Sequence, residues 1–299
     1  RSNEAISLTT RNPRIIEALA KAATGEAQNF EIEERLPVER SLDAHVTPVV
    51  FGHERPQLFL LTFRDRTQER RVERMRADFV ANASHELRTP LASLSGFIET
   101  LQGSAKDDPA AREKFLGIMN DQAKRMARLI DDLLSLSRIE MNEHVQPSDR
   151  VDLADLARQA GALLEPVAAT AGCRLNFDLP GPLPVRGNAN ELSQVIYNLI
   201  ENAIKYAGDG KAIGIRGRAE NGEAVVQVID RGPGIAAHHV PRLTERFYRV
   251  SAQDSRTRGG TGLGLAIVKH ILNRHRGRLS IDSRLGHGSC FAIHLPVVK

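Results

Sequence analysis

The chain has 299 residues, enough for two or three domains, and its 41% apolar content is ordinary for a soluble globular protein. No apolar run could cross a bilayer, no signal peptide is recognisable, and Cys173 and Cys290 support neither a disulfide framework nor a zinc site. The net charge of +4 comes from interleaved acids and bases, and with 4% aromatics and no Trp it favours solvated helix faces over a nucleic-acid surface.

Residues 1–64 have the pattern of a mixed α/β segment. Asn12-Pro13 precedes apolar residues at helical spacing, and Gly25 follows as a stop signal. Three β-prone runs come next, around Phe30 and Ile32, from Leu42 to Val50, and from Leu58 to Phe63. This order resembles the C-terminal half of a PAS sensor domain that ends in an Arg64-Asp65-Arg66-Thr67 exit.

Residues 65–148 have almost no strand signal and predict two long helices. In the first helix, apolar residues step by three and four from Val72 to Leu101, with a stutter of the heptad pattern beside His85. Gly103 ends this helix. Asp107-Asp108-Pro109 then supplies an N-cap and a first-turn proline for the second helix, whose stripe runs from Met119 to Leu133.

The apolar stripes of these helices need a partner. An antiparallel helical hairpin cannot enclose its seam alone, so we expect a homodimer in which two hairpins form a four-helix bundle. The alternative is a hairpin that packs against neighbouring domains of its own chain.

Residues 149–299 alternate helical stretches with β-prone runs, which predicts an α+β sandwich with helices on one face of a mixed sheet. The helical stretches are 152–171, 189–206 and 261–276. The β-prone runs are 173–179, 212–218, 223–229, 278–283 and 289–295.

His85 lies two residues from the seam positions Ala83 and Leu87, and two helical positions correspond to about 200° of rotation. The imidazole should therefore be exposed, which for an isolated histidine indicates an ordinary surface residue. Glu86 changes this interpretation, because a neighbouring carboxylate can accept the proton that an imidazole loses when it attacks phosphorus. A zinc-protease HExxH motif is excluded, since Thr89 stands where the second histidine would be.

A second set of residues suits a nucleotide. Asn198 and Asn202 share one face of a helix with Lys205 one turn further on, which offers amide oxygens to Mg²⁺ and a cation to phosphates, although an Asn pair alone is more often structural. Asp230 ends a strand before Gly232-Pro233-Gly234-Ile235, where a carboxylate can accept a hydrogen bond from an exocyclic amine and glycines let the backbone approach a base.

Gly259-Gly260-Thr261-Gly262-Leu263-Gly264 leads into an apolar helix whose free N–H groups can face phosphates. The run is not the GxGxxG dinucleotide fingerprint. Each of these signals is weak alone, and their combination in this order is specific.

With these motifs the sequence resembles the bacterial sensor histidine kinases of two-component systems, over about residues 65–299. The matching segments are the H-box at Ser84–Pro90, the N-box at Asn198–Tyr206, the G1-box at Asp230–Gly234, the F-box at Glu245–Arg249 and the G2-box at Gly260–Gly264. The H-box surroundings and the PAS exit are most similar to the phosphate-regulon sensor kinases of the PhoR type. One departure is Leu243-Thr244 before the F-box, where a more apolar approach is common.

The resemblance implies that His85 is the phosphoacceptor, Glu86 its general base, and Thr89 the residue that positions water for dephosphorylation of a regulator. It also implies an ATP-binding domain of the GHKL/Bergerat type, in which Asn202 binds Mg²⁺. The residues expected to contact ATP are Asn198, Asn202, Lys205, Tyr206, Asp230, Gly232, Gly234, Ile235, Phe247, Gly260, Thr261, Gly262, Leu263 and Gly264. Related hydrolases carry a Glu where this chain has Asn198, and an amide cannot act as a general base, so the site suits phosphoryl transfer better than hydrolysis.

We therefore expect three domains: a PAS-like sensor segment at 1–64, a helical dimerisation and phosphotransfer domain at 65–148, and a catalytic ATP-binding domain at 149–299. The predicted activity is autophosphorylation of His85 by Mg-ATP and transfer to an Asp of a response regulator receiver domain. The alternatives are a nucleotide-binding scaffold without catalysis and a protein that is mainly a regulator phosphatase. Since the sequence begins with Arg1, we expect the cytoplasmic portion of a protein anchored in the bacterial inner membrane through segments outside this chain, with no direct contact to nucleic acid.

Overall fold

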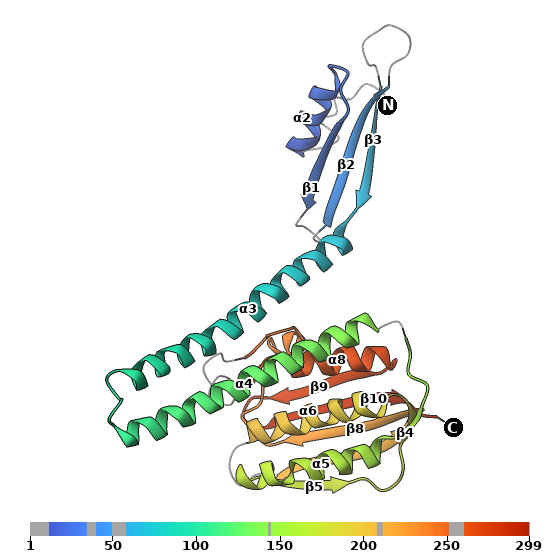
Figure 1. Cartoon of the computed structure of the whole chain (residues 1–299). Coiled ribbons are helices and arrows are strands. Elements are labelled where there is room, and N and C mark those ends of the chain that lie inside the picture. The colour runs from blue at the N-terminus through green and yellow to red at the C-terminus, as the bar shows by residue number, and fades with distance from the viewer. Residues whose placement is uncertain are drawn as a thin grey trace. The chain divides into compact units, whose positions relative to one another are not determined.

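A computed structural model describes residues 12–34, 40–49, 58–142, 145–207, 212–250 and 260–298 (Figure 1). The chain divides into two compact units, residues 1–84 and residues 85–299, and each is described by itself. The bounds of the three domains expected from the sequence are a finer division, and they stay a prediction.

The first unit has one helix on a three-stranded antiparallel sheet of order β1-β2-β3 (Figure 1). Its elements are α2 (Pro13–Ala22), β1 (Gln28–Glu34), β2 (Arg40–Val49) and β3 (Leu58–Asp65). The Asn12 side chain caps α2 by accepting a hydrogen bond from the Arg14 amide. Ile15 of α2 is buried in one cluster with Ile32 and Ala44 of the sheet. These elements confirm the predicted helix and β-runs, apart from Val50, which lies outside the described residues; the PAS assignment stays a prediction.

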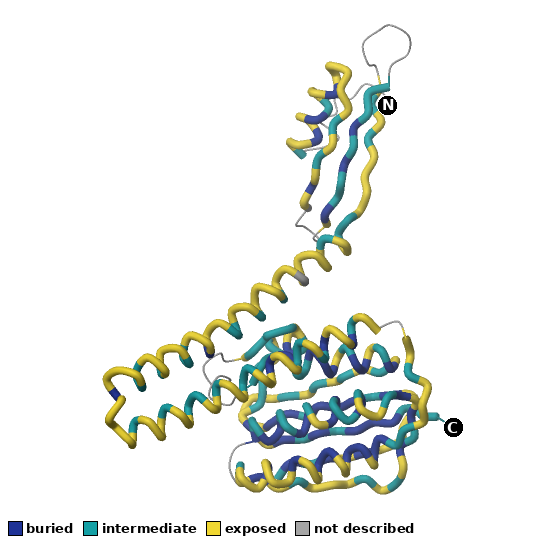
Figure 2. Tube along the Cα trace, viewed as in Figure 1, coloured by how far each residue is buried: buried dark blue, intermediate teal, exposed yellow. Residues whose placement is uncertain are grey.

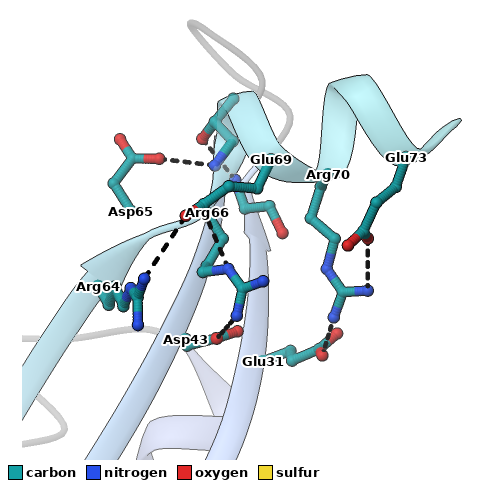
Figure 3. A network of polar contacts seen from close by, with 10 residues as sticks. Glu31, Asp43, Arg64, Asp65, Arg66, Glu69, Arg70 and Glu73 are labelled. Carbon is teal, nitrogen blue, oxygen red and sulfur yellow. Dashed lines mark hydrogen bonds and ion pairs between the residues drawn. The ribbon is translucent and has the colours of Figure 1, made fainter. Parts of the chain in front are cut away.

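Helix α3 (Thr67–Gln102) begins directly after β3 and is tied to the sheet by polar contacts (Figure 3). Asp65 accepts a hydrogen bond from the Thr67 amide at 2.8 Å, and the Thr67 hydroxyl accepts one from the amide of Ser41 at 3.0 Å. Two arginines one turn apart, Arg70 and Arg74, form ion pairs with Glu31 and Glu33 of β1.

In the second unit, the rest of α3 and helix α4 (Pro109–Met141) form the predicted hairpin. The Asp108 side chain accepts hydrogen bonds from the Ala110 and Ala111 amides, which confirms the predicted N-cap. The rings of Phe97 and Phe115 stack between the two helices at 5.1 Å. Pro90 is buried and lies inside α3, which continues through it without interruption.

A five-stranded sheet of order β5-β7-β8-β10-β9 fills the rest of this unit, and α5 (Leu153–Thr170), α6 (Ala189–Ala207) and α8 (Gly264–Arg274) cover one face (Figure 1). The strands are β5 (Arg174–Asp178), β7 (Ala212–Glu220), β8 (Glu223–Asp230), β9 (Arg278–Arg284) and β10 (Gly288–Pro296). Only β5 and β7 are parallel, so the predicted mixed sheet with helices on one face is confirmed. Two short strands, β4 (Arg150–Asp152) and β6 (Pro184–Arg186), and a 3-10 turn at Val240–Arg242 were not anticipated.

Helix α4 has both buried and exposed residues along its length (Figure 2). It contacts α8, and Leu129, Leu136 and Ile139 are buried. Several other apolar residues of the hairpin are at least 43% exposed, among them Leu91 and Ile98. The hairpin therefore packs partly against its own chain and leaves a second apolar surface exposed. Among the residues that the structure describes, no helix is long and apolar enough to span a membrane.

Candidate functional site

A cavity of about 480 Å³ lies between α4, α6, the beginning of α8 and the ends of β8 and β10. Most residues predicted to contact a nucleotide line it, although they come from segments far apart in sequence. These are Asn198, Asn202, Lys205, Tyr206, Asp230, Gly234, Ile235, Gly260, Thr261, Gly262 and Gly264.

Helix α6 supplies the amides and the lysine. Its apolar face, which includes Ile196 and Ile200, is buried. The polar residues Asn198, Asn202 and Lys205 line the cavity. The Asn198 amide nitrogen donates a hydrogen bond to the carbonyl of Gly264 at 3.4 Å, which leaves its oxygen available to a ligand. Lys205 forms an ion pair with Glu201 one turn earlier, at 3.0 Å. The helical spacing thus places amide oxygens and an ammonium group on one wall.

Asp230 is 5% exposed at the end of β8 and accepts a hydrogen bond from the Gly232 amide at 2.8 Å. Gly232 does not line the cavity: a Cβ there would lie 2.3 Å from the Tyr206 carbonyl oxygen, so only glycine allows the chain to pass. The backbone of Gly234 is left-handed, with φ of +71°. This tight path holds the Asp230 carboxylate in one position.

The glycine-rich segment meets the F-box through its backbone. Phe247 has φ of +62°, and its amide donates to the carbonyl of Gly262 at 2.8 Å. Gly262 is also left-handed, and Leu263 is fully buried beneath it. Phe247 and Leu263 therefore shape the loop without lining the cavity, and their predicted contact with nucleotide, like that of Gly232, stays a prediction. Gly259 lies outside the described residues.

His85 and Thr89 lie on α3 and do not line the cavity. His85 is exposed, as its position relative to the seam predicted. The Thr89 hydroxyl donates a hydrogen bond to the His85 carbonyl at 3.2 Å, inside the helix. An imidazole on a stable helix and open to solvent is accessible to a phosphate donor.

Glu86 connects α3 with the cavity. Its carboxylate forms ion pairs with Arg125 of α4 at 3.3 Å and with Arg249 at 3.0 Å. Arg249 lines the cavity and is 9% exposed. A carboxylate that accepts hydrogen bonds from two guanidinium groups has fewer lone pairs free for an imidazole proton. In this arrangement Glu86 serves as a link between the helix and the nucleotide-binding segment.

Three cavity residues, Arg128, Asp131 and Asp132, come from α4 and were missed by the sequence reasoning. Asp132 accepts a hydrogen bond from the Thr261 hydroxyl at 2.6 Å. Burial raises the pKa of the Asp132 carboxyl above its ordinary value, while this hydrogen bond acts in the opposite direction. No sequence motif identifies these residues, because they line the cavity only as a result of the packing of α4 against the sheet domain.

The cavity combines features that suit a purine nucleotide. A fixed carboxylate at one end can accept a hydrogen bond from an exocyclic amine, and the beginning of α8 can bind phosphate. Amide oxygens of α6 are hard ligands suited to Mg²⁺. No group of three or more His, Cys, Asp or Glu side chains that could hold a metal ion occurs within the described ranges.

Comparisons with known proteins agree with this geometry. The model of the His Kinase A (phospho-acceptor) domain matches residues 75–142, and that of the histidine kinase-, DNA gyrase B- and HSP90-like ATPases matches residues 187–299. The chain is 39% identical to the phosphate regulon sensor protein PhoR of Pseudomonas aeruginosa over 97% of its length, and 38% identical to the sensor-like histidine kinase SenX3 of Mycolicibacterium smegmatis over 78%. It spans 64% and 60% of the length of these two relatives.

Solved structures show the same fold. The histidine kinase AdeS of Acinetobacter baumannii, 26% identical, aligns with a TM-score of 0.57 over 72% of this chain and 98% of its own. The histidine kinase ThkA in complex with the response regulator protein TrrA, 20% identical, aligns with a TM-score of 0.61 over 95% of this chain and 83% of its own. By its phospho-acceptor and ATPase domains, in this order, the chain belongs to the sensor histidine kinases.

Proposed function

We propose that this chain binds Mg-ATP, phosphorylates itself on His85 and passes the phosphoryl group to an aspartate of a response regulator. One observation carries the proposal: the predicted nucleotide residues gather on one cavity, and Arg249 of that cavity is bonded to Glu86, the neighbour of an exposed histidine. The cavity accounts for the phosphate donor, and His85 for the acceptor.

In the proposed reaction, one imidazole nitrogen of His85 attacks the γ-phosphorus. A nitrogen–phosphorus bond forms, the bond between the γ-phosphorus and its bridging oxygen breaks, and ADP leaves. The other ring nitrogen loses its proton to Glu86. Because Glu86 is held by Arg125 and Arg249, it has to exchange at least one of these partners for the imidazole before it can act as a base.

The cation is assigned to the α6 wall. Asn202 lines the cavity, and Asn198 has its nitrogen engaged with Gly264, so amide oxygens remain for a hard cation. Mg²⁺ bound there would neutralise charge on the phosphates of ATP. Thr261 and the first amides of α8 would hold the phosphate oxygens.

A labelling experiment tests the assignment. Incubation with ATP labelled at the γ-phosphate should give a phosphoprotein that is labile to acid and stable to alkali, and His85→Gln should abolish the label. ATP affinity of His85→Gln, measured by calorimetry, is the control and should match the unchanged chain, because His85 does not line the cavity. Persistent label in His85→Gln would contradict the assignment of the acceptor.

Transfer to a response regulator is inferred from the family, and the solved ThkA structure is a complex with the response regulator protein TrrA. We also propose that Thr89 supports dephosphorylation of the regulator. Its hydroxyl donates to the His85 carbonyl within α3 and would have to turn toward solvent to position water. Thr89→Ala should lose dephosphorylation and keep autophosphorylation, whereas His85→Gln should lose autophosphorylation. ATP binding without any phosphorylation would favour the scaffold alternative.

We further propose a homodimer through the exposed apolar surface of the hairpin, which includes Leu91, Ile98, Leu116 and Ile130. A four-helix bundle would cover these side chains. The likeness to PhoR supports a role in the phosphate regulon, and attachment to the inner membrane through segments outside this chain stays a prediction. Sedimentation that shows only monomers at micromolar concentration would contradict the dimer.

A further inference from the structure

Thr261 joins helix α4 to the beginning of α8. Its hydroxyl donates a hydrogen bond to Asp132 at 2.6 Å and accepts one from the Leu263 amide at 3.3 Å. Because α8 begins at Gly264, this amide belongs to the N-terminal end of the helix, where the helix dipole is positive. The Asp132 carboxylate is therefore connected, through a single hydroxyl, to the helix end that suits a phosphate.

The surroundings of Asp132 disfavour its ionised form. The carboxyl is half-buried in the cavity wall, and burial raises its pKa. Glu201 and Asp131 add negative charge nearby, whereas Lys205 and the Thr261 hydroxyl favour the ionised form. Lys205 is itself paired with Glu201. A nucleotide would bring further negative charge into this wall.

We infer that Asp132 is a positioning residue that accepts the Thr261 hydroxyl and competes, as a built-in anion, with the phosphates of the nucleotide. The inference rests on the proposed function, because it states that Asp132 lowers the affinity of the same cavity for ATP. The contact between α4 and Thr261 and the binding of ATP then oppose each other. By thermodynamic reciprocity, bound ATP weakens this contact by the same free energy by which the contact lowers the affinity for ATP.

The sign of the effect separates this role from a structural one. Loss of a residue that merely supports the cavity would weaken nucleotide binding, whereas loss of a competing anion strengthens it. Asp132→Asn is the informative change, because an amide oxygen can still accept the Thr261 hydroxyl while the negative charge is gone. We expect the Kd for Mg-ATP to fall about tenfold, within the usual range of such couplings. The KM for ATP should fall in parallel.

Asp121→Asn provides the matched control. Asp121 lies three turns earlier on α4, is exposed to solvent, carries the same charge and does not line the cavity. Solvent screens its charge, so we expect a change in Kd of less than about twofold. Asp132→Ser, which also removes the charge and keeps a small polar group, serves as a second variant if Asp132→Asn folds poorly, and should change the Kd in the same direction.

Calorimetric titration of the full chain with Mg-ATP gives distinct outcomes. If the unchanged chain fails to bind Mg-ATP, the proposed function itself fails. If the unchanged chain binds and Asp132→Asn binds equally or more weakly, the inference is overturned while the proposed function stands. An equal gain in Asp121→Asn would also overturn it, because the effect would then be one of general charge.

Discussion

At the scale of single residues, Gly234 is the position where the backbone of the nucleotide site has the least freedom. Its φ is +71°, and a Cβ would lie 2.0 Å from the carbonyl oxygen of Arg284. Left-handed backbone costs an L-residue roughly 1–2 kcal/mol, and the steric overlap adds to this cost. Gly234→Ala should therefore lower the free energy of unfolding by about 3–5 kcal/mol and abolish binding of Mg-ATP. Urea denaturation and calorimetry of the full chain measure the two effects.

Gly286 supplies the control for this change. It has φ of +78°, close to that of Gly234, but its Cβ would meet no atom within 4 Å. Gly286→Ala should cost only the conformational term of roughly 1–2 kcal/mol and leave nucleotide affinity intact. Equal losses in the two variants would show that the close approach to Arg284 is unimportant.

The residues of the site were predictable from sequence where a motif fixes their chemistry. Asn198, Asn202 and Asp230 were identified because amide and carboxylate groups in this order suit a nucleotide, and all three line the cavity. Asp132 could not be identified, because nothing in its neighbours on α4 distinguishes it from a solvated helix face. Its role depends on which surface α4 presents to Thr261.

At the scale of elements, the spacing of the arginines at the start of α3 matches the spacing of their glutamate partners on β1. Four helical residues rise about 6.0 Å, and two strand residues about 6.6 Å. Arg70 and Arg74 are four apart on α3, and their partners Glu31 and Glu33 are two apart on β1. Figure 3 shows the first of these pairs, Arg70 with Glu31. Rotation of α3 by one residue, about 100°, would break both pairs at once. The two pairs therefore fix the rotation of the helix relative to the sheet of the first unit.

Charge reversal of both glutamates, Glu31→Arg with Glu33→Arg, should release the first turns of α3. Exposed pairs contribute roughly 0.2–1 kcal/mol each, so loss of both should accelerate hydrogen exchange of the α3 amides after Arg70 by about twofold to thirtyfold. If rotation of α3 transmits a signal, the autophosphorylation rate should change as well. Hydrogen exchange followed by mass spectrometry measures the first effect, and labelled ATP the second.

Two further variants keep this prediction specific. Glu17→Arg removes an ion pair with Lys21 that lies within α2, and it should leave exchange in α3 unchanged. Arg70→Glu with Arg74→Glu, added to the reversed glutamates, restores opposite charges and should restore slow exchange. Failure of this restoration would mean that the glutamates act through contacts other than these two pairs.

The elements themselves were largely predictable, because each carries a clear periodicity or cap. The Asp108-Pro109 start of α4 and the β-runs of the sheet domain are examples. The β4–β6 pair was not, since three-residue strands are too short to show alternation. The apolar stripe of α4 indicated that a partner was needed, but periodicity alone could not divide its residues between α8 and a second hairpin.

At the scale of the whole second unit, ion pairs and hydrogen bonds join the hairpin to the nucleotide-binding domain. Besides the Glu86–Arg249 pair, Arg246 bonds Glu140 of α4 at 2.5 Å, and Ser135 exchanges hydrogen bonds with Gln194 of α6. Phe247 lies between the two arginines with its left-handed backbone. The F-box thus contacts both helices of the hairpin, and under the proposed mechanism this packed arrangement would have to loosen before Glu86 could accept the proton of His85.

Acidity should favour this packed arrangement through Asp132. Because burial raises the pKa of its carboxyl above the ordinary 3.8, the packed form binds a proton more readily than a form in which Asp132 is exposed to water. The ionised carboxylate opposes packing at pH above the raised pKa, and this cost disappears as the pH falls through that pKa toward 3.8. Asp132→Asn lacks the titration, so its α4 should pack more tightly on α8 than in the unchanged chain at neutral pH, and the difference should close on acidification.

Spin labels report the distance between the two helices. They can be attached at the exposed positions Ala127 on α4 and Lys269 on α8, each changed to cysteine after Cys173 and Cys290 are replaced by serine. Glu86 and Glu140 are present in both proteins, so their contribution cancels in the comparison, and a difference that stays constant or widens at low pH would contradict the role of Asp132.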